Sequence, residues 1–488
     1  MTLATSQSAS SIVGRVWNYA SVLRDDGLSY ADYLEQLTYL LFLKMNDERA
    51  SLPGQTRRIP AGDDWDSFRK LDGDALQQQY QSVLENLSKA GGMLGTIFAK
   101  AENRIKTPSL LKRLVSLIDA QEWLALDADV TGDVYESLLE RNAEDVKGGA
   151  GQYFTPRALI RAIVQCVRPK VGEKVCDPAS GTGGFLLAAH EFMKHSRLDR
   201  DQARALSLET FYGTDIVGSV VRLATMNLWL HNIGGDAEPP IAARDALQAH
   251  GGKYYEVVLA NPPFGKKSSF SGVSDDGKVT RETLSYERND FWATTGNKQL
   301  LFLMHIASIL AIDGRAAVVL PDNVLFEGGA GETIRRRLLQ QYDLHTILRL
   351  PTGIFYAGGV KANVLFFDRK PAQEGWWTQG TWVYDLRTNQ NFTMKTNPLR
   401  LSHLEDFIQC YATDDRSQRT QSERFKRYSL EELLARDKVN LDITWLQDNT
   451  LEDAASLPAP DVLALEITEQ LRFALEQFAA IGDELSEA

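Results

Sequence analysis

Two consecutive prolines in the middle of the chain limit what the apolar residues before them can form. Residues 254–260 (YYEVVLA) are followed directly by Asn261-Pro262-Pro263-Phe264. Each proline fixes φ and lacks a backbone N–H, so the prolines stiffen the chain where they stand. The pattern therefore predicts a buried strand that enters a tight turn.

This turn presents an amide, a carbonyl and an aromatic ring to one place, which suits a planar amino group. The Asn261 oxygen and the Pro262 carbonyl can each accept one N–H, and Phe264 can stack on the ring that carries the amine. Holding both hydrogens out of the ring plane favours a nitrogen that attacks an electrophile. We therefore predict Asn261, Pro262, Pro263 and Phe264 as catalytic residues. The alternative is a strand-ending turn with a packed phenylalanine.

A glycine-rich segment at residues 177–185 (DPASGTGGF) lies between a predicted strand and a predicted helix. Strand, glycine turn and helix is the layout of a nucleotide-binding crevice, because glycines let the backbone approach a ligand closely. The spacing is not G-x-G-x-x-G, and no Lys-Ser/Thr pair follows to cradle a phosphate. For this segment alone, a purely structural turn remains an alternative.

Two aspartates, Asp215 and Asp245, each end a predicted strand further along the chain. A carboxylate at Asp215 can accept hydrogen bonds from both hydroxyls of a ribose. Asp245 can accept one from an adenine amino group. Either residue can instead be the N-cap of a helix.

Taken with residues 151–157 (GQYFTPR), these motifs resemble the S-adenosylmethionine-dependent amino-methyltransferases of DNA, in the order of the gamma class of adenine-N6 enzymes. More specifically, the chain resembles the modification (M) subunit of type I restriction-modification systems. The resemblance extends to residues 33–45, 321–326, 350–355 and 382–387, and so covers nearly the whole chain.

The resemblance implies a site-specific enzyme that transfers a methyl group from S-adenosyl-L-methionine to the N6 amino group of a flipped-out adenine. The cofactor-binding residues that it implies are Gln152, Tyr153, Phe154, Thr155, Pro156, Arg157, Asp177, Ser180, Gly181, Thr182, Gly183, Asp215 and Asp245. Two departures stand out: Ser180 replaces a common Cys or Ala, and Asp215 replaces the usual Glu. The side chain of Asp215 is shorter than that of glutamate. It can reach the ribose either through a bridging water or after a shift of the loop, and the sequence does not decide between these two.

Net charge argues against a protein that grips DNA alone, because such proteins carry a basic face and this chain has a formal charge of −12. The chain has two local basic groups, Lys266-Lys267 and Arg335-Arg336-Arg337. Each group either contacts DNA phosphates or is simply solvated, and solvation is the default interpretation for the arginines. The resemblance implies three partners: double-stranded DNA, a specificity (S) subunit bound by two copies of this chain, and a restriction (R) subunit.

Composition indicates a cytoplasmic protein without a metal. The three cysteines suit a reducing cytosol, and no Cys/His cluster has metal-ligand spacing. No apolar run approaches the length of a membrane span, and the N-terminus lacks the pattern of a secretory signal, so no membrane partner is expected.

Periodicity predicts three regions in an α/β protein. Residues 1–146 form an N-terminal all-helical domain, which includes a capped helix at 127–140 and leads to a glycine-rich link at 147–151. Residues 147–372 form a mostly parallel, seven-stranded sheet with helices on both faces, and the resemblance implies that this is a Rossmann-like class I methyltransferase domain. Its strands are predicted at 174–177, 211–215, 241–243, 255–260, 315–320, 344–350 and 362–368, with helices at 217–232, 298–311 and 331–341.

Residues 373–488 form a mixed extension that ends, from Pro458, in an amphipathic helical tail. The resemblance implies that this tail docks on the specificity partner. Residues 265–297 lack a period and are predicted to be a lid, a nucleic-acid contact or a disordered loop. For most of the loop's aromatic residues (Phe270, Tyr286, Phe291 and Trp292), packing against the sheet edge is favoured.

Two other functions stay open. One is a stand-alone adenine methyltransferase, or an enzyme acting on RNA or a protein glutamine; the N-terminal domain and the tail argue against it. The other is a non-catalytic assembly module with a methyltransferase fold, which the intact Asn261 and glycine turn argue against. The chain has no Pro-Cys pair for cytosine-C5 methylation and no Walker-type motif for ATP-driven translocation.

Overall fold

The computed structural model describes residues 30–52, 57–123, 155–235, 239–264, 269–273, 279–283, 286, 288–355, 360–393, 396–447, 464, 467–468 and 471–472. The chain divides into two compact units. Unit 1 comprises Met1–Gly149, Ser180–Gly183 and Leu198–Arg244; unit 2 comprises Ala150–Ala179, Gly184–Arg197 and Asp245–Ala488. The predicted helix at 127–140 and the glycine-rich link lie outside the described residues.

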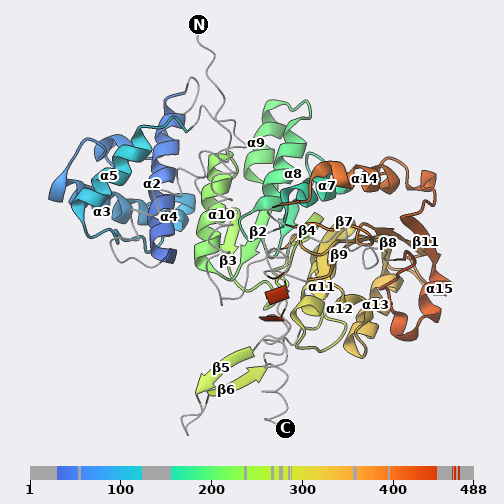
Figure 1. The fold of residues 1–488 in the computed structure, drawn as a ribbon. Coiled ribbons are helices and arrows are strands. Elements are labelled where there is room, and N and C mark those ends of the chain that lie inside the picture. Colours follow the sequence, from blue (N-terminus) through green and yellow to red (C-terminus); the bar gives the residue numbers. More distant parts are fainter. Residues whose placement is uncertain are drawn as a thin grey trace. The chain divides into compact units, whose positions relative to one another are not determined.

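Unit 1 contains the predicted N-terminal helices and one βαβ segment (Figure 1). The helices are α2 (Tyr30–Ala50), α3 (Gly73–Ser88), α4 (Gly92–Ile97) and α5 (Pro108–Asp119), and the second segment contains α9 (Arg200–Leu208), β2 (Phe211–Asp215), α10 (Gly218–Leu230) and β3 (Ile241–Ala243). Proline occupies the first turn of α5, where its missing N–H costs nothing. The apolar face of α5 then repeats at helical spacing: Leu111, Leu114, Val115 and Ile118 are buried.

The N-terminal helices are joined to α10 by polar contacts as well as apolar ones. The Trp229 indole N–H donates to the Asn46 side chain at 2.9 Å, and the Arg58 guanidinium lies 3.3 Å from the centroid of the Trp229 ring. Arg222 of α10 pairs with Glu35 of α2. The first helices and the βαβ segment therefore form one packed body.

Unit 2 contains most of the strands and the helices that pack on them (Figure 1). Its strands are β1 (Val175–Asp177), β4 (Tyr255–Ala260), β7 (Leu310–Pro321), β8 (Tyr342–Arg349), β9 (Ala362–Arg369), β10 (Gly380–Asp385) and β11 (Phe425–Ser429). Its helices are α7 (Arg157–Val167), α8 (Gly184–Lys194), α11 (Lys298–Ile309), α12 (Asn323–Phe326), α13 (Ala330–Gln341), α14 (Glu405–Tyr411) and α15 (Leu430–Ala435). The long loop also holds an antiparallel pair that was not predicted, β5 (Ser269–Val273) and β6 (Val279–Thr283).

The prediction of a mostly parallel, seven-stranded sheet is wrong in strand number and direction. All seven predicted strands are present, but the sheet has nine, in the order β11-β10-β8-β9-β7-β4-β1-β2-β3. Strand β9 runs antiparallel to both β7 and β8, and β11 runs antiparallel to β10. The sheet is therefore mixed.

The chain connections explain the direction of β9. It begins at Ala362, soon after β8 ends at Arg349, with no helix among the described residues between them. A parallel neighbour requires a longer crossover, usually helical, whereas a short connection suits an antiparallel one. Because β4 is parallel to β7, and β10 is parallel to β8, the carboxyl ends of β4, β7, β8 and β10 share one edge of the sheet.

Candidate functional site

The predicted catalytic turn follows β4, whose last four residues are fully buried. Asn261 is half-buried, Pro262 is buried and Pro263 is exposed. The Asn261 Nδ2 group donates to the Thr155 hydroxyl at 2.8 Å. Thr155 lies just before α7, so two segments that were predicted for different purposes, cofactor binding and catalysis, meet in unit 2.

Phe264 packs against a residue that was not predicted as part of the site. Its ring meets the Phe355 ring edge-to-face, with centroids 5.5 Å apart and planes at 85°. Only 8% of Phe264 and 3% of Phe355 is exposed. Phe355 ends the segment 350–355, which the sequence singles out only by its family resemblance. It follows β8, which is separated from β4 by two strands of the sheet, so the sequence gave no local signal of this contact.

The glycine turn is built in unit 1 around two left-handed residues. Gly181 has φ +51° and Gly183 has φ +84°, conformations that favour glycine. A Cβ on Gly183 would lie 3.8–3.9 Å from side chains of α10 and β3, so this part of the turn is closely packed. By contrast, a Cβ on Gly181 would meet no described atom within 4 Å. The backbone at Gly181 is therefore open to a ligand.

Asp215 is joined directly to this turn. The Gly181 N–H donates to Asp215 Oδ2 at 3.2 Å, and the Val217 N–H donates to Oδ1 at 2.9 Å. Burial raises the pKa of Asp215, while these backbone N–H groups act in the opposite direction. The N-cap of α10 is Val217, so the alternative role of Asp215 as a helix cap does not apply. The next residue, Ile216, is 70% exposed, which is unusual for a large apolar side chain.

Asp245 and Asp177 shape turns in unit 2. Asp245 Oδ1 accepts the Leu247 N–H at 2.9 Å, and its Oδ2 accepts the Tyr286 hydroxyl at 2.7 Å. Asp177 is buried and accepts the Ala179 N–H at 3.0 Å, which fixes the start of the glycine-rich segment. Asp245 is followed by a turn and not by a helix, so it is not a helix cap either.

The long loop is anchored by its last described residues. Trp292 packs against Tyr342 of β8 with ring centroids 5.7 Å apart, and its N–H donates to the Met304 sulfur. Trp292 therefore packs on the sheet, but on the interior strand β8 and not on an edge strand, whereas Tyr286 reaches Asp245. The side chain of Phe270 lies outside the described residues, as do Lys266 and Lys267.

Arg335 differs from both of its predicted roles. It is buried and donates to four backbone carbonyls, those of Val324, Glu327, Lys438 and Val439, at 2.7–2.9 Å. Burial lowers its pKa to about 10. Its neighbour Arg336 pairs with Glu332 at 2.9 Å. Arg335 is therefore a structural tie and not a phosphate contact or a solvated charge.

Four of the other predicted cofactor residues are described by the structure, and three are not. Pro156 is the N-cap and Arg157 the first residue of α7, next to Thr155. Ser180 is buried, and its N–H donates to the Thr214 carbonyl at 2.9 Å. The Thr182 carbonyl accepts the Asn227 side chain at 3.3 Å. Gln152, Tyr153 and Phe154 lie outside the described residues.

The described residues show neither a metal cluster nor a membrane span. No group of three or more His, Cys, Asp or Glu side chains within the described ranges is arranged to hold a metal ion. None of the helices in those ranges combines the length and hydropathy that a membrane span requires.

Comparison with known proteins gives similarity along the whole chain. The family model for N-6 DNA Methylase matches residues 126–453, and that for the HsdM N-terminal domain matches residues 12–118. The type I restriction enzyme StySJI methylase subunit of Salmonella typhimurium strain LT2 is 38% identical, over 97% of this chain and 95% of the relative. The EcoKI methylase subunit of Escherichia coli strain K12 has the same identity and coverage. The crystal structure of the EcoKI M protein has 34% identity and a TM-score of 0.54, covering 97% of this chain and 96% of that chain.

Proposed function

The chain belongs to the methylase subunits of type I restriction enzymes, within the N-6 DNA methylase family, and on this premise we propose which residues carry the reaction. It has the α/β methyltransferase fold preceded by an N-terminal helical domain. It transfers a methyl group from S-adenosylmethionine to the N6 amino group of adenine in DNA. The observation that carries the residue assignment is the turn after β4, with its amide held by Thr155.

Asn261 and the Pro262 carbonyl orient the amino group. Both oxygens accept N–H groups from N6, so the nitrogen lone pair is directed at the methyl carbon. The N–C bond forms as the S–C bond of the sulfonium breaks, the neutral thioether leaves, and N6 then gives up a proton to water. No covalent enzyme intermediate is needed, because orientation of the two reactants supplies much of the acceleration.

Phe264 supplies the stacking surface for an adenine that has left the duplex, as its amino group is out of reach inside the stack. The edge-to-face contact with Phe355 supports this role, since it restricts the tilt of the ring before the base arrives. Pro263, the exposed residue of the turn, stiffens the backbone between the two contact groups.

S-adenosylmethionine is the methyl donor, and the open backbone at Gly181 suits it. We assign cofactor binding to Gln152, Tyr153, Phe154, Thr155, Pro156, Arg157, Asp177, Ser180, Gly181, Thr182, Gly183, Asp215 and Asp245. Asp215 holds the ribose hydroxyls, and Asp245 accepts from the adenine amino group. The exposed Ile216 adds an apolar contact for the adenine ring.

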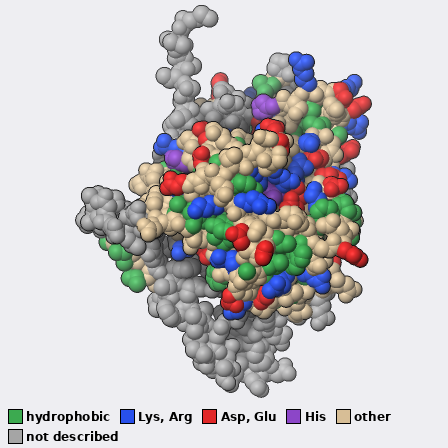
Figure 2. Space-filling model, turned by 90° about the vertical axis from the view of Figure 1, so that its right-hand side faces the viewer, with side chains coloured by type: hydrophobic (Ala, Val, Ile, Leu, Met, Phe, Trp, Pro, Cys, Tyr) green, Lys and Arg blue, Asp and Glu red, His purple; other side chains and the backbone are tan. Residues whose placement is uncertain are grey.

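The partners we assign are double-stranded DNA, a specificity subunit that binds two copies of this chain, and a restriction subunit, all in the cytoplasm. The formal net charge of −12 supports a partner subunit that binds the DNA phosphates, because an acidic chain binds them poorly by itself. On the face shown in Figure 2, the described basic and acidic side chains are interspersed and form no broad basic field.

The proposed domains are 1–146, 147–372 and 373–488, with the tail from Pro458 as the docking element. Only five residues of this tail are described, and they are helical. Among them Ile467 and Leu471, four residues apart on one helix face, are 52% and 65% exposed. An apolar face of this kind supports docking on a partner.

Calorimetric binding of S-adenosylmethionine to a Gly181→Val variant tests the cofactor assignment. A valine there points into the open space and should abolish binding. Because valine is also strained at φ +51°, Gly73→Val is the matched control: Gly73 has φ +56°, and a Cβ added to it would meet no described atom within 4 Å. Unchanged affinity in a folded Gly181→Val variant, or equal loss in both variants, would contradict the assignment.

A further inference from the structure

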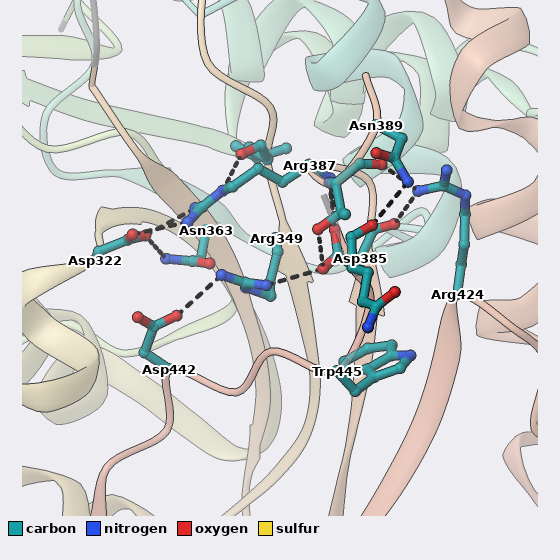
Figure 3. Close-up of polar contacts among 12 residues, drawn as sticks. Asp322, Arg349, Asn363, Asp385, Arg387, Asn389, Arg424, Asp442 and Trp445 are labelled. Atoms are coloured by element: carbon teal, nitrogen blue, oxygen red, sulfur yellow. Dashed lines mark hydrogen bonds and ion pairs between the residues drawn. The ribbon is translucent and has the colours of Figure 1, made fainter. Parts of the chain in front are cut away.

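One arginine joins the ends of four strands beside the catalytic turn. Arg387 follows β10, and its guanidinium forms two parallel hydrogen bonds of 2.8 Å with the carboxylate of Asp322, which follows β7. Its Nε donates to the carbonyl of Leu350 after β8, at 2.8 Å, and its Nη2 donates to the carbonyl of Ala362 in β9, at 2.9 Å. Asn363 donates to the same Asp322 carboxylate at 2.8 Å (Figure 3).

A second, more deeply buried pair holds Arg387 in place. Arg349 and Asp385 are 2.9 Å apart and almost fully buried, and Figure 3 shows Arg349 between Asp385 and Asp442. Asp385 Oδ1 also accepts the backbone N–H groups of Arg387 and Thr388, both at 2.8 Å. The backbone that carries Arg387 is therefore fixed by a carboxylate that is itself neutralised by Arg349.

The segment held by Arg387 leads directly to the aromatic contact behind Phe264. Leu350, whose carbonyl Arg387 binds, begins a turn in which Gly353 has φ +79°. A Cβ on Gly353 would lie 2.0 Å from the Phe392 carbonyl oxygen, so this turn is pressed against another backbone and only glycine fits. The turn ends at Phe355, which packs edge-to-face on Phe264.

We propose that Arg387 is a positioning residue for the adenine site. It holds the turn 350–355 so that Phe355 supports the Phe264 ring, and it touches neither the base nor the cofactor itself. This inference rests on the proposed role of Phe264. It also gives one role to three segments that the sequence singles out only by family resemblance, 321–326, 350–355 and 382–387.

A purely structural role is the alternative, because buried ion pairs are weak evidence for any specific function. Arg315 provides a matched control within the same unit. It forms two hydrogen bonds of 2.8 Å with the Glu173 carboxylate and donates to the carbonyls of Val167 and Arg168 at 2.7 and 2.6 Å. Its bonding pattern matches that of Arg387, but its contacts do not involve the turn 350–355.

The test compares Arg387→Lys with Arg315→Lys in the complex reconstituted with the specificity subunit. Lysine keeps the charge but cannot form the fork to the carboxylate while reaching the backbone carbonyls. Three quantities are measured: S-adenosylmethionine affinity, fluorescence of 2-aminopurine at the methylated position of a DNA duplex, and the single-turnover rate of methyl transfer.

We expect Arg387→Lys to lose about tenfold or more in the rate of methyl transfer, since small displacements of the reacting groups lower that rate strongly. It should also lose most of the 2-aminopurine fluorescence signal. Its cofactor affinity should stay within about twofold, because its contacts leave the groups assigned to the cofactor intact. Arg315→Lys should keep rate and signal. If the two variants behave alike, the positioning role is overturned.

Phe355→Leu provides a second variant that leaves the ion network intact, should Arg387→Lys fail to fold. It should reproduce the loss of rate and signal with unchanged cofactor affinity; normal values would overturn the inference. Failure of the proposed function can be told apart from failure of the positioning role. If the proposed function is wrong, Asn261→Ala remains active. An inactive Asn261→Ala beside a normal Arg387→Lys refutes only the positioning role.

Discussion

Replacing Asn261 with alanine separates methyl transfer from folding and from cofactor binding. The variant loses the amide oxygen proposed to accept from N6, a contact that matters mainly in the transition state. Loss of one preorganised group of this kind costs about 3–4 kcal/mol, or roughly 10²–10³ in rate. The fold loses the hydrogen bond of 2.8 Å to Thr155, worth about 1 kcal/mol net. Because domains have about 5–15 kcal/mol of stability, the variant should remain folded.

The assay is transfer of a tritiated methyl group to DNA by the complex with the specificity subunit, together with calorimetry of S-adenosylmethionine. Thr155→Val is the informative comparison, since it removes the same hydrogen bond but keeps the amide. We expect Asn261→Ala to lose nearly all transfer with normal cofactor affinity, and Thr155→Val to lose less transfer. Near-normal transfer by Asn261→Ala would refute the mechanism, whatever its stability.

Three further predictions follow from charge, burial and the tail. Burial lowers the pKa of His345 to about 4, so the unfolded chain binds more protons below pH 6.5 and stability falls as pH falls. From pH 7.5 to 5 this loss should be about 2 kcal/mol by urea unfolding, and smaller in His345→Gln. Burial raises the pKa of Asp215, and we propose that its carboxylate form binds ribose, so cofactor affinity should weaken as pH falls towards that pKa; an Asp215→Asn variant with the same pH profile would contradict this. Deleting the residues after Pro458 should abolish complex formation in size-exclusion chromatography, and a full-size, active complex would show that the tail is not a partner face.

The strands that surround the site could be predicted because each is an apolar run bounded by Gly, Pro or Asp. The direction of β9 was mispredicted, although the β8–β9 link has no helical pattern and so already favours an antiparallel neighbour. Strand β11 (FKRYS) was missed because edge strands carry charges and do not alternate clearly. Strand β10 was not predicted as a strand either, so two missed strands and the direction of β9 account for the difference between the predicted and observed sheets.

The place of Asn261 at the end of β4 was predictable because the two prolines that follow end the strand, whereas its catalytic role stays a prediction. Arg335 was mispredicted from its two arginine neighbours, yet the helical spacing held the correct signal. Gly331, Ile334 and Leu338 are buried on α13, and position 335 lies on the same face. The Phe264–Phe355 contact had no such signal, because it joins two turns that only the folded sheet brings together.

Methylation of adenine N6 by this chain, as one subunit of a complex, can be measured in a host that lacks adenine methylation. The chain is expressed there with its proposed specificity subunit, and the host DNA is sequenced for modified bases. We expect N6-methyladenine at one defined sequence, its loss in Asn261→Ala, and little modification when either protein is expressed alone. Modified cytosine, no modification by the intact pair, or full site-specific activity of this chain alone would contradict this expectation.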